Sequence, residues 1–175
     1  INSAQYSNID LNFDGVQDLF VFDKSCNQIL CYIQNGGPGQ IDYEFAPELT
    51  EKFPVIKDWA VLGDYNLDGK ADILASASGT VQLFKNISTV STGIEFELIK
   101  YGITASFNNW ANDPFISCGL ADIPAFVDVD GDNDLDILSF SGNSKCLWYY
   151  KNMSQENYGH SDSLDFLTAS VCYGN

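Results

Sequence analysis

Aspartate residues recur in this chain at a spacing that suits the coordination of a hard metal ion. The segment VDVDGDNDLDIL, residues 127–138, places aspartates at alternating positions and then becomes apolar. Carboxylates this close repel one another, and folding removes part of their hydration, so the cluster is costly without a counter-charge. A divalent cation among the side chains would supply that charge.

Two upstream segments repeat the pattern. They are DLNFDGVQDLF, which begins at Asp10, and DYNLDGKADIL, which begins at Asp64, and both align with DVDGDNDLDIL from Asp128. Each has Asp at position 1, Asp or Asn at position 3, and Asp at positions 5 and 9, followed by two apolar residues. Three copies in one frame indicate a repeated binding loop rather than three unrelated turns.

Calcium is the metal that this pattern fits best. It takes six to eight oxygen ligands at about 2.3–2.6 Å from carboxylates, amides, backbone carbonyls and water. Side chains at positions 1, 3 and 5 converge if the backbone turns at position 6, where Gly15, Gly69 and Asn133 tolerate positive φ. Magnesium, which keeps its waters, and zinc, which prefers His and Cys, fit less well.

The predicted ligands form one set in each loop. They are Asp10, Asn12, Asp14, Val16 and Asp18 in the first loop, Asp64, Asn66, Asp68, Lys70 and Asp72 in the second, and Asp128, Asp130, Asp132, Asp134 and Asp136 in the third. The residue at position 7 offers its backbone carbonyl, so the side chain of Asp134 is expected to point away from the ion. The third loop has Asp130 where the others have asparagine, and ligand charge alone predicts that it binds calcium most tightly.

Short strands are predicted on both sides of every loop. AQYSNI, WAVLG and IPAFV precede the loops, and ILCYIQN, VQLFKN and CLWYYKN follow them, each ending in asparagine. Further on, IDYEFAPEL, IEFELIKY and LDFLTASV alternate between apolar and polar residues, as strands do. No segment shows a convincing helical period. The sequence therefore predicts an all-β chain, a single repeat domain over residues 1–175 with repeats at roughly 1–50, 51–105 and 106–175.

The loops, D-x-[DN]-x-D-G-x-x-D between short strands, resemble the FG-GAP/VCBS repeats of integrin-α-like β-propellers, as in large secreted surface proteins of Bacteroidetes-type bacteria. The resemblance covers essentially the whole chain and departs at Asn133, where the family usually has Gly. It implies β-propeller-type blades of four-stranded antiparallel sheets, with each loop joining the two innermost strands. Propellers usually close with four to eight blades. About three blades therefore imply a partial propeller, which we expect to be a fragment of a longer one.

Composition narrows the class of partner. The chain has 24 Asp and Glu against 8 Lys and Arg, a net charge of −16, and it is 45% hydrophobic. We expect no nucleic-acid partner and no membrane span in so acidic a globular chain. The resemblance to FG-GAP/VCBS repeats implies a secreted, extracellular or cell-surface protein, and the loops predict three Ca²⁺ sites. Its expected partners are adjoining blades of the same polypeptide or neighbouring subunits, with a cell-surface protein or a glycan as a candidate ligand.

The expected function is cell adhesion or scaffolding without catalysis. The only histidine, His160, lies in a polar loop without a nucleophile motif, so we expect no enzyme. One alternative is a carbohydrate-binding or enzyme-associated module with active residues elsewhere. Trp110 is its candidate contact, whereas Trp59 and Trp148 are expected in the core. The other alternative is a subunit of an extracellular filament.

Five cysteines give a weaker signal. Their number is odd, so at least one thiol stays free or pairs outside the chain. A bridge from Cys26 to Cys31 across a hairpin is one possibility. Pairing of Cys146 or Cys172 with a neighbouring strand is another.

Glycosylation signals are present but ambiguous. Asn86 and Asn152 each begin an Asn-x-Ser sequon, yet both stand at strand ends, where turn residues are expected. Ser163 lies in an Asp-Ser-Leu segment that resembles the O-glycosylation signal of Bacteroidetes secreted proteins. An ordinary Asx or Ser turn is the simpler interpretation of this segment. Glycoprotein status therefore stays open.

Overall fold

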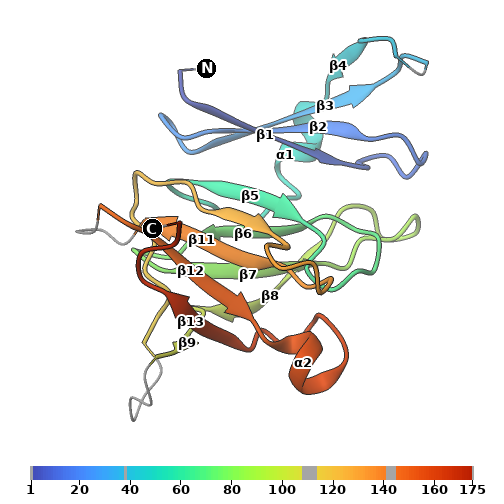
Figure 1. Ribbon diagram of the computed structural model, residues 1–175. Coiled ribbons are helices and arrows are strands. Elements are labelled where there is room, and N and C mark those ends of the chain that lie inside the picture. The colour runs from blue at the N-terminus through green and yellow to red at the C-terminus, as the bar shows by residue number, and fades with distance from the viewer. Residues whose placement is uncertain (1, 38, 108–113, 141–144, 175) are drawn as a thin grey trace.

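The structure, a computed structural model, describes residues 2–37, 39–107, 114–140 and 145–174. In this part of the chain three β-sheets follow one another along the sequence (Figure 1). The first sheet has the order β1 (Ala4–Ile9), β2 (Asp18–Asp23), β3 (Gln28–Gln34) and β4 (Tyr43–Phe45). The second has β5 (Ala60–Gly63), β6 (Asp72–Ser76), β7 (Val81–Asn86) and β8 (Phe96–Tyr101). The third contains β10 (Ala125–Val127), β11 (Asp136–Phe140), β12 (Leu147–Asn152) and β13 (Phe166–Ser170).

Neighbouring strands within these four-strand sets are antiparallel, which confirms the all-β prediction. The third sheet differs in one respect, because β9 (Ala105–Ser106) adds a fifth strand parallel to β13. Ile103 and Ala105 are each only 1% exposed and belong to the apolar cluster between the second and third sheets, so the chain that leaves the second sheet enters this core as it reaches β9. The prediction of four strands in every sheet is therefore wrong for the third. Short helices α1 (Pro47–Thr50) and α2 (Ser154–Tyr158) were also not predicted.

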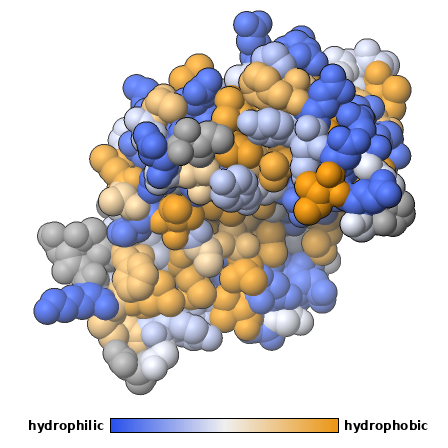
Figure 2. Space-filling view, turned by 90° about the horizontal axis from the view of Figure 1, so that it is seen from above, coloured by the Kyte–Doolittle hydropathy of each residue, from blue (hydrophilic) through white to orange (hydrophobic). Residues whose placement is uncertain are grey.

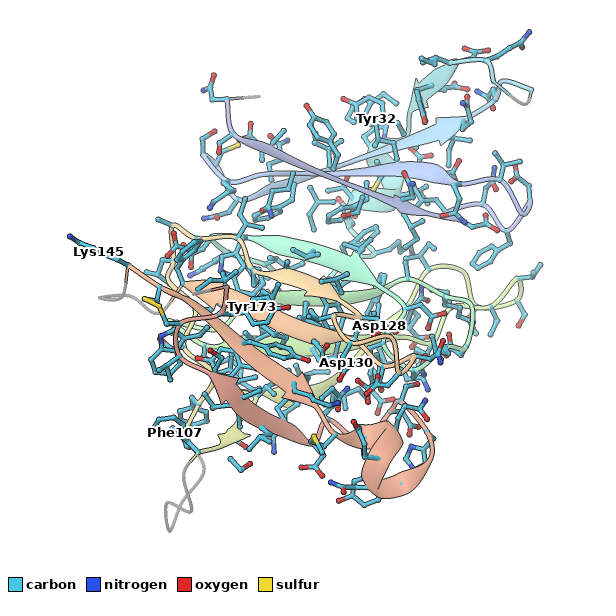
Figure 3. The ribbon with its side chains drawn as sticks, viewed as in Figure 1. Tyr32, Phe107, Asp128, Asp130, Lys145 and Tyr173 are labelled. Atoms are coloured by element: carbon cyan, nitrogen blue, oxygen red, sulfur yellow. A yellow bond between two sulfur atoms is a disulfide. The ribbon has the colours of Figure 1, made fainter. Side chains whose placement is uncertain are left out.

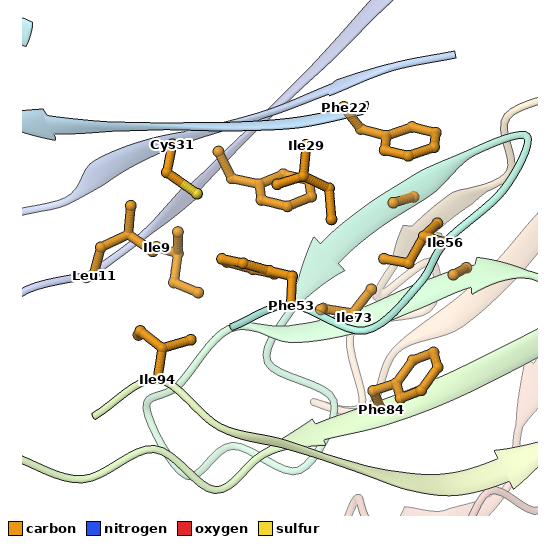
Figure 4. Packing of buried hydrophobic residues seen from close by; sticks show 13 residues of the cluster. Ile9, Leu11, Phe22, Ile29, Cys31, Phe53, Ile56, Ile73, Phe84 and Ile94 are labelled. Carbon is orange, nitrogen blue, oxygen red and sulfur yellow. The ribbon is translucent and has the colours of Figure 1, made fainter. Parts of the chain in front are cut away.

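The sheets stack face to face, and the second sheet lies between the other two (Figure 1). One apolar cluster joins the first sheet to the second and includes Phe20, Phe53 and Ile73 (Figure 4). A second cluster, with Trp59 and Ile137, joins the second sheet to the third. Both faces of the central strands β6 and β7 are thus buried, as expected when a blade needs neighbours to complete its core, whereas β8 at the edge is largely exposed.

The first strands of the three sheets lie along one edge of the stack. Strand β5 contacts both β1 and β10. Gly63, at the end of β5, permits the close approach to β10, because a Cβ at this position would lie 3.1 Å from Cδ1 of Phe126. The acidic loops connect the first and second strands of each sheet, so all of them sit at the same end of this edge. The described residues form an open stack and not a closed ring.

The two end sheets have apolar side chains on their outer faces. On the first sheet, Tyr6 and Phe45 point away from the core and are 66% and 49% exposed. On the third, Val127 and Phe140 are 43% and 46% exposed. Figure 2, viewed from the side of the first sheet, shows apolar side chains interspersed with polar ones. These faces are the open ends of the stack.

A disulfide joins Cys146 to Cys172, with a Cα–Cα distance of 4.7 Å, and ties the start of β12 to the segment after β13. The alternative bridge between Cys26 and Cys31 is wrong, because both are free thiols. Cys31 points into the core between the first two sheets, whereas Cys26 is exposed in the turn before β3. Cys118 is the third free thiol of the described residues, and it is buried.

Candidate metal-binding loops

The aspartate at position 9 of each loop is buried and joins three segments of its sheet. Asp18, Asp72 and Asp136 are all 0% exposed. In the second loop, Asp72 accepts hydrogen bonds from the backbone N–H of Tyr65 at 3.1 Å and of Asn86 at 2.7 Å. The same pair of bonds reaches Asp18 from Leu11 and Gln34, and Asp136 from Val129 and Asn152. Each carboxylate therefore connects its loop to the end of the third strand.

These bonds correct the alignment of the repeats after the loops. The backbone donors to position 9 are Gln34, Asn86 and Asn152, so Gln34, and not Asn35, is the counterpart of the two asparagines. Its side-chain oxygen accepts from the N–H of Gly36, two residues on, as those of Asn86 and Asn152 do from their own i+2 residues. Asn86 and Asn152 are 4% and 2% exposed, so both sequon side chains are buried parts of the strand end.

The aspartate at position 1 organises the turn. Asp10 accepts from the N–H groups of Asp14 and Gly15, and Asp64 accepts from those of Asp68 and Gly69. In the third loop, Asp128 accepts from the N–H groups of Gly131, Asp132 and Asn133. The aspartate at position 5 also accepts from the residue two positions later in every loop. The loops are therefore wrapped so that the side chains at positions 1 and 5 face the same backbone turn.

Positive φ occurs at position 6, as the sequence predicts, with values of 82° at Gly15, 85° at Gly69 and 71° at Asn133. A second left-handed residue at position 4 was not predicted. It is Phe13 or Leu67 in the first two loops, at 64° and 59°, and Gly131 in the third, at 83°. The third loop has thus exchanged its glycine between the two positions. Asparagine at 133 is accommodated because it tolerates the left-handed region better than most residues with a side chain.

The predicted ligands of the third loop lie closest together. Of the acidic, histidine and cysteine side chains described, Asp128, Asp130 and Asp136 offer oxygens within 4.8 Å of one another (Figure 3). A second set of this kind contains Asp130, Asp132 and Glu156, and the described part of the first two loops gives no such set. There, the amide of Asn12 or Asn66 donates to the position 5 carboxylate, at 2.9 and 3.1 Å.

Side chains at position 7 make their contacts outside the loops. Val16 is exposed, Lys70 donates to the carbonyl of Ser88 at 2.9 Å, and Asp134 accepts from the N–H of Gln155 at 3.0 Å. Asp134 is nevertheless 0% exposed. Burial raises the pKa of Asp134 to about 7, and the nearby carboxylates of Asp132 and Asp136 act in the same direction.

Within the described residues, two buried carboxylate oxygens of the third loop, Oδ2 of Asp132 and Oδ1 of Asp134, lack a hydrogen-bond donor. Only that of Asp132 belongs to the predicted side-chain ligands, and Nζ of Lys151 lies 3.6 Å from it. A buried carboxylate oxygen without a donor is costly and is usually satisfied by a cation or a water molecule. The position 9 oxygens also keep a lone pair beyond their backbone bonds. All-oxygen ligands in this number suit calcium, which would offset part of the negative charge of the cluster when bound.

The sequence reasoning missed the basic and acidic side chains that approach the third loop from outside. Lys151, on β12, forms ion pairs with Asp130 and with Glu156 of α2, and its Nζ lies 3.6 Å from Oδ2 of Asp132. The Lys151 hydrogen bonds hold the pKa of Asp130 and Glu156 below their usual values. Tyr149 also donates to Oδ2 of Asp136 at 3.2 Å. In the sequence, the only sign of this contact is Lys151 in the segment YYKN. Its place beside Asp130 follows from the strand register, which the sequence alone does not give.

Other candidate residues lie away from the loops. His160 pairs with Asp162, and their side chains are 53% and 51% exposed. Trp59 is fully buried and Trp148 packs against the same cluster, as predicted, whereas Trp110 lies outside the described residues. No helix among the residues described has the length and apolar character needed to cross a membrane.

Three stacked, mainly antiparallel sheets, each with an acidic loop between its first two strands, define an all-β repeat protein. Residues 10–75 match the family model described as an FG-GAP-like repeat, which covers the first two acidic loops. For these residues the match confirms the resemblance to FG-GAP repeats that the loop spacing indicates. No curated protein and no solved structure gives a significant match to the chain.

Raised pKa values in these loops predict a dependence of stability on pH. Burial raises the pKa of Asp72 to about 6 and, as above, that of Asp134 to about 7, against 3.8 for an ordinary Asp. At a pH between 3.8 and these raised pKa values, the folded chain binds more protons than the unfolded chain. Its stability therefore falls as the pH rises through them. In excess chelator, we expect the thermal midpoint to be several degrees higher at pH 5.5 than at pH 7.5. Scanning calorimetry measures this, and a midpoint that rises with pH in chelator would contradict it.

Proposed function

We propose that the chain is a calcium-binding β-propeller module of a secreted or cell-surface protein, and that it acts in adhesion or scaffolding. The observation that carries this proposal is the buried position 9 aspartate, which links an acidic loop to two strands in all three sheets. An ion held by such a loop would fix the ends of three strands at once. FG-GAP repeats occur in extracellular proteins, and this supports the location.

The three loops offer different ligand charge to calcium. The first loop has Asp10, Asp14 and Asp18 with one amide, and the second has the equivalent set from Asp64 to Asp72. The third replaces the amide with Asp130. In each loop the backbone carbonyl at position 7 would complete the set. Calcium has a mechanical role in this proposal, because binding to the folded loops alone stabilises the fold.

The open ends of the stack support adjoining blades or neighbouring subunits as partners. Tyr6 and Phe45 on the first sheet and Val127 and Phe140 on the third expose apolar area on two different faces. Contact between two different faces is heterologous, and it produces a ring when it closes and a filament when it does not. A longer propeller and an extracellular filament both follow from the same surfaces. We propose no catalytic role for His160, whose described contacts are with Asp162 and the ring of Tyr158.

Calorimetric titration of the metal-free chain with Ca²⁺ tests the proposal. We expect three bound ions, and we expect Asp14→Ala, Asp68→Ala and Asp132→Ala each to reduce the number by one, since each removes a ligand at position 5. Ser163→Ala, at an exposed position outside the loops, is the matched control and should leave three. A wild-type chain that binds no calcium at millimolar concentration would exclude the proposed role of the metal.

A further inference from the structure

The residue before the strand-end Gln or Asn differs among the three repeats in a way that bears on the loops. Because Gln34, Asn86 and Asn152 make the same backbone bond to position 9, the residues before them are structural equivalents. These are Ile33, Lys85 and Lys151. The register supports this, since Lys85 and Lys151 each pair with the fourth strand of their sheet as Ile33 does.

The side chains at this position differ in charge and in their distance from the carboxylates of the acidic loop. Ile33 carries none, and Lys85 places its Nζ 3.7 Å from Oδ2 of Asp68, at position 5. Lys151 is in direct contact with Asp130, at position 3, and lies 3.6 Å from Asp132, at position 5. Its side chain is 21% exposed, so the ion pairs are partly shielded from water.

Helix α2, between β12 and β13, holds the ammonium group in place, and the described residues between β3 and β4 and between β7 and β8 form no such helix. Glu156 of this helix forms an ion pair with Lys151. Oxygens of Glu156, Asp130 and Asp132 lie within 4.8 Å of one another, and the Lys151 ammonium sits among them. Lys151 is therefore placed by both its own strand and the following helix, whereas Lys85 has one loop carboxylate.

We propose that Lys151 is an internal counter-cation of the third loop and competes with a divalent ion for Asp130 and Asp132. This inference rests on the proposed calcium binding and concerns its regulation. An ammonium group and a calcium ion held by the same two carboxylates repel each other, so the presence of one disfavours binding of the other. The third loop therefore binds calcium more weakly than its four carboxylates imply, and it stays folded at lower calcium concentration than the first. The ammonium offsets one of the four carboxylate charges, so the third loop loses the advantage over the first that ligand charge alone predicts.

A calcium titration with one reporter in each loop tests the competition. The backbone amides of Gly15, Gly69 and Gly131 belong to the first, second and third loops and can be followed separately by ¹H–¹⁵N NMR of the 175-residue chain. In Lys151→Met, we expect the dissociation constant reported by Gly131 to fall at least about tenfold, while those from Gly15 and Gly69 stay within about twofold. Lys151→Gln, which is neutral and keeps a polar end, should change it in the same direction.

Charge and position are separated by two controls. Lys151→Arg keeps the charge and should stay within about threefold of the wild type. Lys85→Met removes the lysine with the longer contact, and its effect at Gly69 should be smaller than that of Lys151→Met at Gly131. An unchanged or weaker affinity at Gly131 in both neutral variants would overturn the inference. If instead no glycine reports binding in any chain, the proposed calcium function fails with it, so the two failures are distinguishable.

Discussion

Removal of calcium is expected to lower the thermal midpoint of the folded chain by more than about 10 °C. An ion at 100 times its dissociation constant stabilises a folded protein by about 2.7 kcal/mol per site. For a chain of this size, 1 kcal/mol corresponds to about 2–4 °C. The first and second loops depend fully on calcium in this proposal, and the third depends on it less because Lys151 offsets part of its charge. Together they account for a shift of this size.

Differential scanning calorimetry in millimolar Ca²⁺ and in excess chelator measures this shift. Magnesium at equal concentration is the control for ionic strength, and it should recover little of the midpoint because it demands a strict octahedral set of ligands. The Asp14→Ala and Asp68→Ala variants should each lose part of the calcium-dependent shift. A midpoint that is the same in calcium and in chelator would contradict a stabilising metal at these loops.

The sheets could be predicted from the sequence because their pattern is local and repeated. The short run AQYSNI before a loop, the acidic loop itself and the apolar run after it fix strand, turn and strand within a few residues. The loop from Asp64 to Asp72 also fixes its own turn, since Gly69 supplies the positive φ that the backbone requires. Repetition in one frame then removes the ambiguity of a single copy.

Features that depend on distant contacts could not be predicted in this way. The parallel pairing of Ala105 with Phe166 joins the end of one repeat to the last strand of the next. The positive φ of Phe13 is rare for a bulky residue and is maintained by the side-chain and backbone bonds of its loop. The position of Lys151 beside Asp130 depends on strand register, in which one residue changes the face to which a side chain points.

Substitution of Asp72 by alanine is expected to destabilise the metal-free chain by about 3–5 kcal/mol. Asp72 accepts backbone hydrogen bonds from Tyr65 and Asn86, and all three residues are at most 4% exposed. Alanine would leave two buried N–H groups without an acceptor, and each costs about 1–3 kcal/mol. The loop would also lose its connection to the end of β7.

Asp68→Ala is the matched control, because it removes another carboxylate of the same loop from an exposed position. In chelator we expect it to cost less than about 1 kcal/mol, since exposed polar contacts contribute little. Urea unfolding in chelator, followed by circular dichroism, separates this structural role of Asp72 from its role as a ligand. Asp72→Asn should lie between the two, because an amide keeps one acceptor and presents a donor to the other N–H. Equal losses for Asp72→Ala and Asp68→Ala in chelator would mean that position 9 acts through the metal alone, and the buried bonds to Tyr65 and Asn86 would then contribute nothing measurable.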